Sequence, residues 1–180
     1  MKAEKRKKKV RAIALTGIGT ALFVAVTLCL QVPVFENYYL CLGYIVMAVY
    51  CYSLGAVSGT IVGCCGTFFY CLLISGMRGM PGWVAGNLVI GIVLGVTFQK
   101  TKKLQKLWLK APLNFLAIAA ATAVGILLLK SLTECILYAQ PPAVRIGKNL
   151  FAFVADIFVL GMSLPLCMLL DKKLSNILQT

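Results

Sequence analysis

The stretch "YYLCLGYIVMAVYCYSLGAVSGTIVGCCGTFFYCLLI", residues 38–74, contains no charged side chain. An apolar helix needs about 20 residues to cross a hydrocarbon core of about 30 Å, so this run is too long for a single crossing. Its natural turn is "YSLGAVSG" at residues 52–59, where glycine and serine interrupt the apolar pattern. We therefore expect two membrane-spanning helices here, at residues 38–54 and 57–74, separated only by glycines.

The composition of the whole chain also indicates a membrane protein. Of its 180 residues, 61% are hydrophobic and 13% are charged, against roughly 45–50% and 25% in soluble domains. Further apolar runs predict four more spans, at residues 12–32, 81–99, 112–129 and 146–170. The sequence therefore predicts an all-α integral membrane protein, a six-transmembrane-helix bundle that forms a single membrane domain over residues 1–180.

Positive charge gathers at one side of the predicted bundle. Of 18 Lys and Arg, seven lie in residues 1–11, five lie in residues 100–110, and Lys172 and Lys173 follow the last span. With six spans all of these fall on the same side, and the positive-inside rule then places both termini in the cytoplasm. We expect the protein to lie in the cell (plasma) membrane. Topology and anionic membrane lipid account for the net charge of +13, so we expect no nucleic-acid partner.

Several chemistries lack the residues that they need. The chain has no histidine, and its eight cysteines are scattered without a C-x-x-C pair, so we expect no metal site and no cofactor. No G-x-x-x-x-G-K-[ST] loop is present to hold nucleotide phosphates, and serine or cysteine nucleophiles have no histidine base. We therefore expect a protein that is not an enzyme and does not hydrolyse ATP itself.

One acid lies inside a predicted span. "KNLFAFVADIFVLGMSLPL", residues 148–166, carries Asp156 near its middle. An intramembrane carboxylate costs at least ~2.5 kcal/mol on insertion scales and usually faces the bundle interior. Because Glu36 and Glu134 fall outside the predicted spans, Asp156 is expected to be the one acid within the membrane. Arg145 and Asn149 share its helix face, at spacings of eleven and seven residues.

A second polar pair lies on the span at 81–99, where Trp83 and Asn87 are one turn apart. If the two faces converge, they form a mostly apolar pocket with a few placed polar groups, which is typical of a small-molecule site. We expect Trp83 to stack on a planar ring of the ligand, and Asn87 and Asn149 to form hydrogen bonds with the polar edge of that ring. Alternatives remain open: an interfacial anchor for Trp83 or Arg145, and interhelical hydrogen bonds for the two asparagines.

The role of Asp156 is likewise open. It accepts hydrogen bonds from an amine or N–H group of a ligand, or it pairs with a neighbouring helix and only holds the bundle.

Small residues four apart form three stripes along the predicted helices, and such stripes allow close helix approach. They are Gly17, Ala21 and Ala25; Gly55, Gly59 and Gly63; and Gly91 and Gly95. The glycine stripes predict packing inside the bundle, and the first stripe is equally suited to contacting a partner.

The chain resembles the substrate-binding S component of an energy-coupling-factor (ECF) vitamin transporter, in the riboflavin-type group. The features that carry the resemblance are the lysine-rich start running into "RAIALTGIGTALFVAVTL", the loop "QVPVFENYYLCLGY", the glycine-rich "LGAVSGTIVGCCGTFFYCLL", "GMRGMPGWVAGNLVIGIVLG" and "LPLCMLLDKKL". The resemblance covers essentially the whole chain. It implies a subunit that captures a vitamin-like small molecule at high affinity and joins a scaffold transmembrane subunit and two ATP-hydrolysing subunits.

The resemblance also implies roles for residues. Gly17, Ala21 and Ala25 match the small-residue motif through which the family's first helix contacts the scaffold, although the first position is Gly rather than Ala. The family's loop between the first two helices covers the pocket, and here Phe35, Asn37 and Tyr39 would belong to that lid.

The substrate stays open among riboflavin, pyridoxine-type vitamins, and pyrimidine or queuosine precursors. The alternatives are a small secondary carrier using Asp156 as a proton-linked acid, and a membrane enzyme or assembly factor acting on lipid.

Overall fold

The computed structural model describes residues 2–30, 32–35, 38–74, 80–104 and 106–179. For some of these residues, near the termini, in the hairpin and at position 107, it describes only the backbone. The elements in order are α1 (Lys2–Cys29), β1 (Val32–Phe35), β2 (Tyr38–Leu40), α2 (Gly43–Leu54), α3 (Ala56–Ile74), α4 (Met80–Thr101), α5 (Leu107–Thr122), the π-helix η1 (Ala123–Lys130), α6 (Ser131–Tyr138) and α7 (Pro142–Gln179). The chain is therefore helical apart from one short hairpin, which confirms the predicted fold class in outline.

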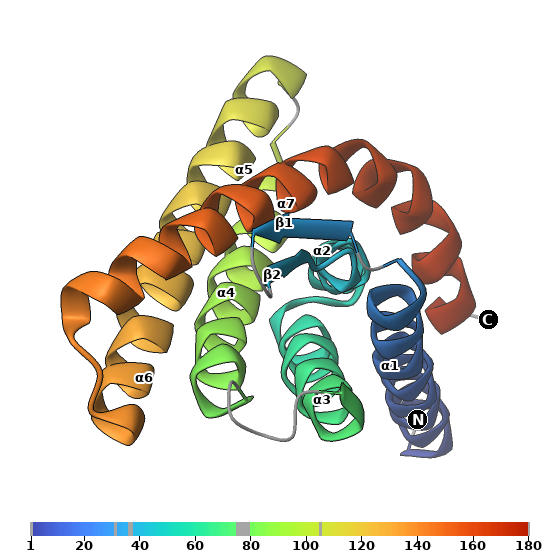
Figure 1. Cartoon of the computed structure of the whole chain (residues 1–180). Coiled ribbons are helices and arrows are strands. Elements are labelled where there is room, and N and C mark those ends of the chain that lie inside the picture. The colour runs from blue at the N-terminus through green and yellow to red at the C-terminus, as the bar shows by residue number, and fades with distance from the viewer. Residues whose placement is uncertain (1, 31, 36–37, 75–79, 105, 180) are drawn as a thin grey trace.

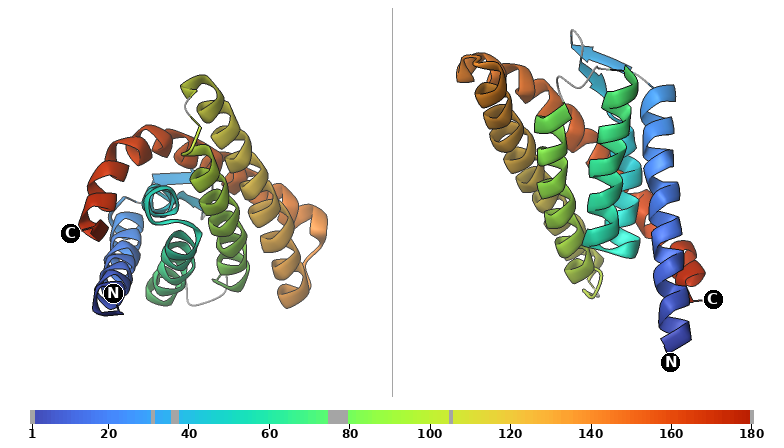
Figure 2. Two further views of the ribbon diagram at one scale, coloured as in Figure 1. Left: turned by 180° about the vertical axis from the view of Figure 1, so that it is seen from behind. Right: turned by 90° about the horizontal axis from the view of Figure 1, so that it is seen from below.

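Five helical stretches are long and apolar enough to cross a membrane. They are Arg6–Cys29, Ala56–Ile74, Met80–Thr101, Trp108–Tyr138 and Pro142–Asp171. The helices stand side by side, with α2 at the centre among α1, α3, α4 and α7 (Figures 1 and 2). Both termini lie at one end of the bundle, and the hairpin lies at the opposite end (Figure 2).

The charge-free segment that predicts two helices does contain two, with a break at Gly55. Its φ of +93° lies in a region that glycine adopts without the steric cost that a Cβ would bring. The first of the two helices is shorter than predicted, because Tyr38–Leu40 pairs with Val32–Phe35 as an antiparallel strand before α2 begins. Valine and tyrosine favour such extended pairing. At 12 residues, α2 is about 18 Å long, less than a hydrocarbon core of about 30 Å.

The predicted fifth span is longer than its sequence suggested. It does not end at residue 129 but continues through η1 and α6 to Tyr138. As a consequence, Glu134, which the sequence places outside the predicted spans, lies in the same helical stretch and is 4% exposed. The helix continues past Lys130 because both charged side chains face inward to oppositely charged partners, while Leu132 and Ile136 face outward.

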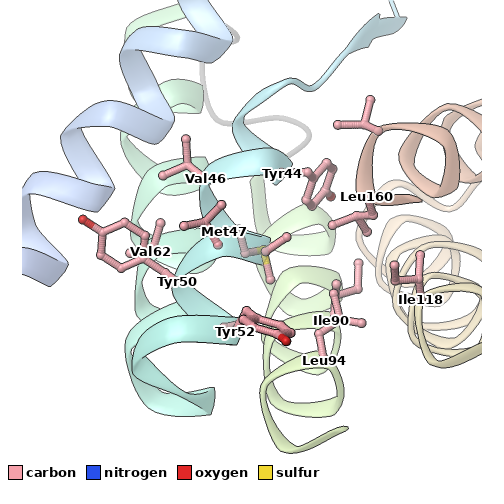
Figure 3. Close-up of a cluster of buried hydrophobic side chains, with 14 of the residues drawn as sticks. Tyr44, Val46, Met47, Tyr50, Tyr52, Val62, Ile90, Leu94, Ile118 and Leu160 are labelled. Carbon is pink, nitrogen blue, oxygen red and sulfur yellow. The ribbon is translucent and has the colours of Figure 1, made fainter. Parts of the chain in front are cut away.

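The glycine stripes pack the centre of the bundle, as the sequence predicted. A Cβ built at four of the five stripe glycines would meet a neighbouring helix at 2.7 Å or less: Gly59 meets Cys51, Gly63 meets Met47, Gly91 meets Thr60 and Gly95 meets Ala56. The close approach packs the α2 side chains of Tyr44 and Met47 into an apolar cluster with Val62, Ile90, Leu94 and Leu160 of the surrounding helices (Figure 3). The core is therefore centred on the helix that has the least contact with the outside of the bundle.

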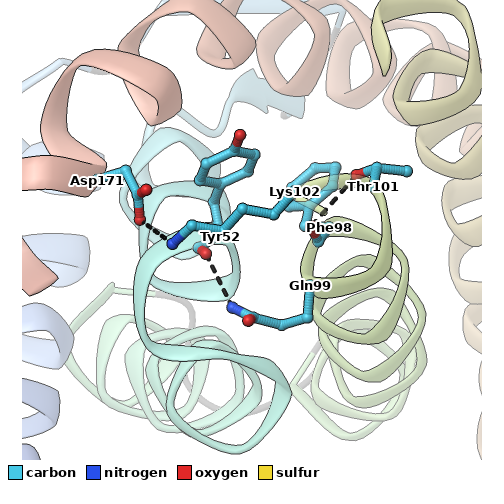
Figure 4. A network of polar contacts seen from close by, with 6 residues as sticks. All are labelled: Tyr52, Phe98, Gln99, Thr101, Lys102 and Asp171. Carbon is cyan, nitrogen blue, oxygen red and sulfur yellow. Dashed lines mark hydrogen bonds and ion pairs between the residues drawn. The ribbon is translucent and has the colours of Figure 1, made fainter. Parts of the chain in front are cut away.

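A polar cluster joins α2, α4 and α7 at the end of α4 (Figure 4). Lys102 forms an ion pair with Asp171 at 2.5 Å and lies 5.6 Å from the centroid of the Tyr52 ring. The Gln99 amide donates to the backbone oxygen of Tyr52 at 2.9 Å. These contacts connect the C-terminal ends of α2 and α4 to the last third of α7.

Candidate substrate-binding site

A polar network lies among apolar side chains in the half of the bundle near the hairpin. Its first part is built around Tyr44, which is fully buried in the first turn of α2. The indole Nε1 of Trp83 donates to the Tyr44 hydroxyl at 2.8 Å, and that hydroxyl donates to Oδ1 of Asn87 at 2.7 Å. The Trp83 ring also packs edge-on against Tyr70, with centroids 5.7 Å apart. α4 thus presents both predicted residues, Trp83 and Asn87, to the centre of the bundle.

The hydrogen bonds of Asn87 all go to other helices. Its Nδ2 donates to the backbone oxygen of Gly63 at 3.3 Å and to the Thr67 hydroxyl at 2.5 Å, and its Oδ1 accepts from Tyr44. Both ends of this amide are therefore occupied within the protein. The arrangement favours interhelical hydrogen bonding for Asn87, which the sequence left open beside a role in ligand recognition.

The second part of the network joins α6 to α7. Nδ2 of Asn149 donates to the Ser131 hydroxyl at 2.9 Å and to Oε2 of Glu134 at 3.2 Å. The same Glu134 oxygen lies 3.5 Å from NH1 of Arg145, whose guanidinium lies 5.9 Å from the centroid of the Tyr138 ring. Asn149 is completely buried, and the Arg145 side chain is 20% exposed. Arg145 therefore contributes to an ion pair between two helices as well as standing near a helix end.

Asp156 links the first part to the end of η1. Its carboxyl group interacts with the Tyr44 hydroxyl of the first part and attracts the Lys130 ammonium at the end of η1. The first turn of α4 packs close to this point, since a Cβ at Gly82 would lie 3.1 Å from the Lys130 backbone oxygen and 3.3 Å from Cγ of Glu134. Of the two roles left open for Asp156, pairing with a neighbouring helix is therefore present in the structure.

The π-helix η1 brings Lys130 and Ser131 into the network. π-helical segments are rare and occur frequently at functional sites. Here the segment packs its Gly125 directly on Gly86 of α4, where a Cβ on either residue would lie less than 3 Å from the other's backbone oxygen. The Ser131 hydroxyl donates back to the Ile126 oxygen at 3.3 Å, five residues earlier. The wider turn thus sets the direction in which the polar side chains after it point.

The charges in the network balance. Two cations, Lys130 and Arg145, face two carboxylates, Asp156 and Glu134. Because buried charges are costly unless they are paired, this balance explains how four ionisable groups are accommodated among apolar helices. Asp156 is therefore not an isolated acid in this bundle, and its role toward a ligand stays a prediction.

The structure gathers five of the eight predicted substrate contacts: Trp83, Asn87, Arg145, Asn149 and Asp156. Phe35 and Tyr39 lie in the strands of the hairpin, where Phe35 pairs with Tyr38 and Tyr39 with Pro33, but their side chains, and Asn37 as a whole, lie outside what the structure describes. The hairpin itself contacts α7, the helix that carries Asn149 and Asp156. The lid assignment therefore remains a prediction.

The predicted partner stripe on α1 faces away from the bundle. Gly17, Ala21 and Ala25 are all exposed, and a Cβ at Gly17 would meet no atom within 4 Å. The opposite face of α1 packs inward through Gly19, which lies against the Tyr50 ring, and through Phe23. Of the two interpretations left open for this stripe, packing within the bundle is not what the structure shows.

Sequence reasoning missed Tyr44, Lys130, Ser131 and Glu134 as members of the site. One signal for two of them was available. Lys130 and Glu134 have opposite charges and lie four residues apart, the spacing that places two side chains on the same face of a helix. Extending the span by two turns would have brought both into the bundle. Tyr44 carried no such signal, because it lies in a run with several other tyrosines.

The fold and the network define an integral membrane protein with a polar site enclosed by its helices. The chain belongs to the family described as ECF-type riboflavin transporter, S component, whose sequence profile matches residues 7–172. This confirms the resemblance found in the sequence. Members of this family are substrate-binding subunits of transporters rather than enzymes, and the protein is therefore a membrane-embedded, substrate-binding transport subunit.

Relatives are similar at low identity. A UPF0397 protein of Streptococcus thermophilus strain LMD-9 is 24% identical over 163 residues, which cover 87% of this chain and 87% of the relative. A second UPF0397 protein, from strain CNRZ 1066 of the same species, is 27% identical over 95 residues, covering 53% of this chain and 52% of the relative. No solved structure matches the chain.

Proposed function

We infer that this chain captures a vitamin or related heterocyclic micronutrient from outside the cell and delivers it to an ECF-type ABC importer. The observation that carries the proposal is the polar network of α2, α4, α6 and α7, which is buried in an apolar bundle next to the hairpin. A mostly apolar enclosure with a few placed polar groups is the usual make-up of a small-molecule site. The family description names riboflavin, which makes it the first ligand to test.

The proposed topology has six crossings with both termini in the cytoplasm. Two observations support it: the termini lie at one end of the bundle (Figure 2), and residues 1–11 and 100–110 are rich in Lys and Arg, which the positive-inside rule would place in the cytoplasm. α2 would complete the second crossing together with the hairpin, which continues the chain toward the outer end. The network would then open outward, beneath the loop that carries Phe35, Asn37 and Tyr39.

The proposed partners are one scaffold transmembrane subunit and two ATP-hydrolysing subunits. The sequence has no phosphate-binding loop of its own, so an energy source must come from elsewhere. Gly17, Ala21 and Ala25 form the proposed contact with the scaffold, because their small side chains are exposed on α1 and would allow a partner helix to approach closely.

Native mass spectrometry of the detergent-purified protein tests ligand capture. We expect a bound heterocycle that is released and identified on activation. The Asp156→Asn variant should retain less of it, because this change removes the charge that faces Lys130 and alters the contact with Tyr44. An empty protein that also gives no thermal shift with a vitamin panel would contradict the proposal.

Co-purification tests the partnership. A tagged chain expressed in its own host should bring down the scaffold and ATP-hydrolysing subunits, whereas a secondary carrier or a membrane enzyme should not. Gly17→Leu should abolish capture without affecting folding, since a Cβ at this exposed position meets no atom of this chain within 4 Å. Gly147→Leu is the matched control: Gly147 is also exposed with no atom near its Cβ, but it lies on α7, and this variant should capture the partners normally.

A further inference from the structure

A surface of lysines and leucines lies where α4 passes into α5, at the end of the bundle that holds both termini (Figure 2). One apolar span, Met80–Thr101, ends just before it, and the next, Trp108–Tyr138, begins within it. Because the connection between the two spans is short, it lies at the boundary between hydrocarbon and water. The surface, called the α5 face below, consists of Lys103, Lys106, Lys110, Leu109, Leu113 and Leu116.

The leucines of the α5 face continue the line of a lysine along the helix. Lys106 is the N-cap of α5, and its backbone oxygen accepts from the N–H of Lys110 at 3.3 Å. Positions three, seven and ten residues further on share one side of an α-helix. Counted from Lys106, these positions are Leu109, Leu113 and Leu116, and all three are exposed. This side of α5 therefore runs from a cation at the boundary to apolar surface deeper in the bilayer.

The lysines of the α5 face form no ion pair among the described residues. Asp171 is already paired with Lys102, and the first turn of α5 contains no acid. The start of a helix carries a partial positive charge, which disfavours cations there and favours anions. An anion from outside the chain would therefore offset both the lysines and the helix end.

Trp108 indicates that lipid rather than a protein covers this turn. Its side chain is 91% exposed, and tryptophan is enriched at the boundary between membrane and water. It lies two residues after Lys106, about 200° around the helix. Apolar and cationic groups thus point to opposite sides of one turn. The lipids around a helix cover both sides at once, whereas a single protein surface covers one.

We propose that the α5 face binds an anionic phospholipid. Lys103, Lys106 and Lys110 contact the phosphate of its headgroup, and an acyl chain lies along the three leucines. Side chains on a helix tilt toward its N-terminus, which directs the lysines of α5 to the headgroup level. The inference goes beyond the proposed function, because it does not depend on which solute the protein carries.

Native mass spectrometry of the full-length protein, titrated in neutral detergent, tests the preference for an anionic headgroup. The probes are phosphatidylglycerol and phosphatidylcholine with identical acyl chains. A lysine near an anionic lipid surface contributes about fivefold in affinity. We therefore expect the first phosphatidylglycerol to bind at least about tenfold more tightly than the first phosphatidylcholine.

Two triple variants locate the preference. The variant Lys103→Gln, Lys106→Gln, Lys110→Gln should bind the two lipids to within about threefold of each other. Its side chains are at least partly exposed, so we expect it to fold. The matched control is Lys7→Gln, Lys8→Gln, Lys9→Gln, which removes the same charge from exposed positions of α1. This control should keep the preference of the wild-type protein to within about twofold.

Fluorescence quenching tests the acyl-chain half of the proposal in vesicles of equal parts phosphatidylglycerol and phosphatidylcholine. One of the two lipids carries bromine on its acyl chains, which quenches a tryptophan that it touches. Leu113→Trp places a reporter on the α5 face, in a Trp108→Phe background that also serves as the blank. Brominated phosphatidylglycerol should quench this reporter at least about twice as strongly as brominated phosphatidylcholine. In the wild-type protein Trp108, on the other side of the turn, should be quenched equally by both.

Three results would overturn the proposal. Equal binding of the two lipids by the wild-type protein would show that the headgroup charge is not recognised. An equal loss of preference in both triple variants would show that only net charge acts. Equal quenching of the Leu113→Trp reporter by both lipids would show that no anionic lipid is held on the α5 face. If the two lipids bound equally and the α5 triple variant also failed to co-purify with its partner subunits, the α5 face would be a protein contact instead.

Discussion

Replacing Gly95 with alanine tests the contact between α3 and α4. A Cβ at Gly95 would lie 2.2 Å from Cα of Ala56 and 2.7 Å from its backbone nitrogen. These are main-chain atoms, so no side-chain rotation relieves the overlap. To restore an ordinary contact of 3.4 Å, α3 and α4 must separate locally by about 1.2 Å, which opens the packing along the rest of their interface.

The expected cost follows from two opposing effects. Overpacking a tight interface costs about 1–3 kcal/mol, and the rigid neighbour places this site at the upper end. Alanine in place of glycine within a helix returns up to about 1 kcal/mol through helix propensity. We therefore expect Gly95→Ala to lower the free energy of unfolding by about 2 kcal/mol.

The assay is reversible unfolding in mixed micelles of increasing SDS content, followed by circular dichroism and tryptophan fluorescence. Gly17→Ala is the matched control, because Gly17 also lies within a helix but its Cβ would meet no atom within 4 Å. We expect this control to be neutral or slightly stabilising. If Gly95→Ala were as stable as Gly17→Ala, then α3 and α4 would not approach each other as closely as described, and the interpretation of the glycine stripes would fail.

Three further predictions concern the network, the α4 end and the topology. Trp83→Phe keeps an aromatic ring but removes the N–H that donates to Tyr44, and should lower the free energy of unfolding by about 1 kcal/mol in the same assay; an unchanged value would place that hydrogen bond in doubt. Asp171→Asn should change stability by less than about 1 kcal/mol, since its pair with Lys102 is partly exposed, and a larger loss would show that the pair is a main connection of α7. Cys29, the one exposed cysteine among those described, should react with an impermeant maleimide added to intact cells when the other cysteines are alanine; labelling only after permeabilisation would reverse the proposed topology.

The parts of the fold that depend on local chemistry could be predicted from the sequence. The turn at Gly55 follows from the conformation that glycine permits, and the glycine stripes follow from the spacing of residues on a helix. The inward face of α7 follows in the same way, because polar residues at turn-related positions in an apolar run must share a side. In these cases the residue that carries the signal is also the residue that forms the feature.

The parts that depend on distant pairing could not be predicted. From the sequence, Lys130 is expected to mark the end of a span, because a lone lysine is costly in lipid. In the structure Lys130 is buried, and Asp156 on another helix faces it. The π-helical turn of η1 has no signature in its run of apolar residues, yet it sets where Ser131 points. Tyr44 became recognisable as the centre of the network only once Trp83 and Asn87 of α4 were placed against it.

The short helix α2 has a consequence for how this protein is made. A segment of about 18 Å that is almost wholly enclosed by its neighbours has little apolar surface directed at lipid and cannot cross the bilayer alone as a stable helix. We therefore expect α2 to enter the membrane together with α3, its immediate successor across Gly55, as a helical hairpin. On this expectation α2 becomes enclosed only after α4 and α7, its later neighbours, have been synthesised.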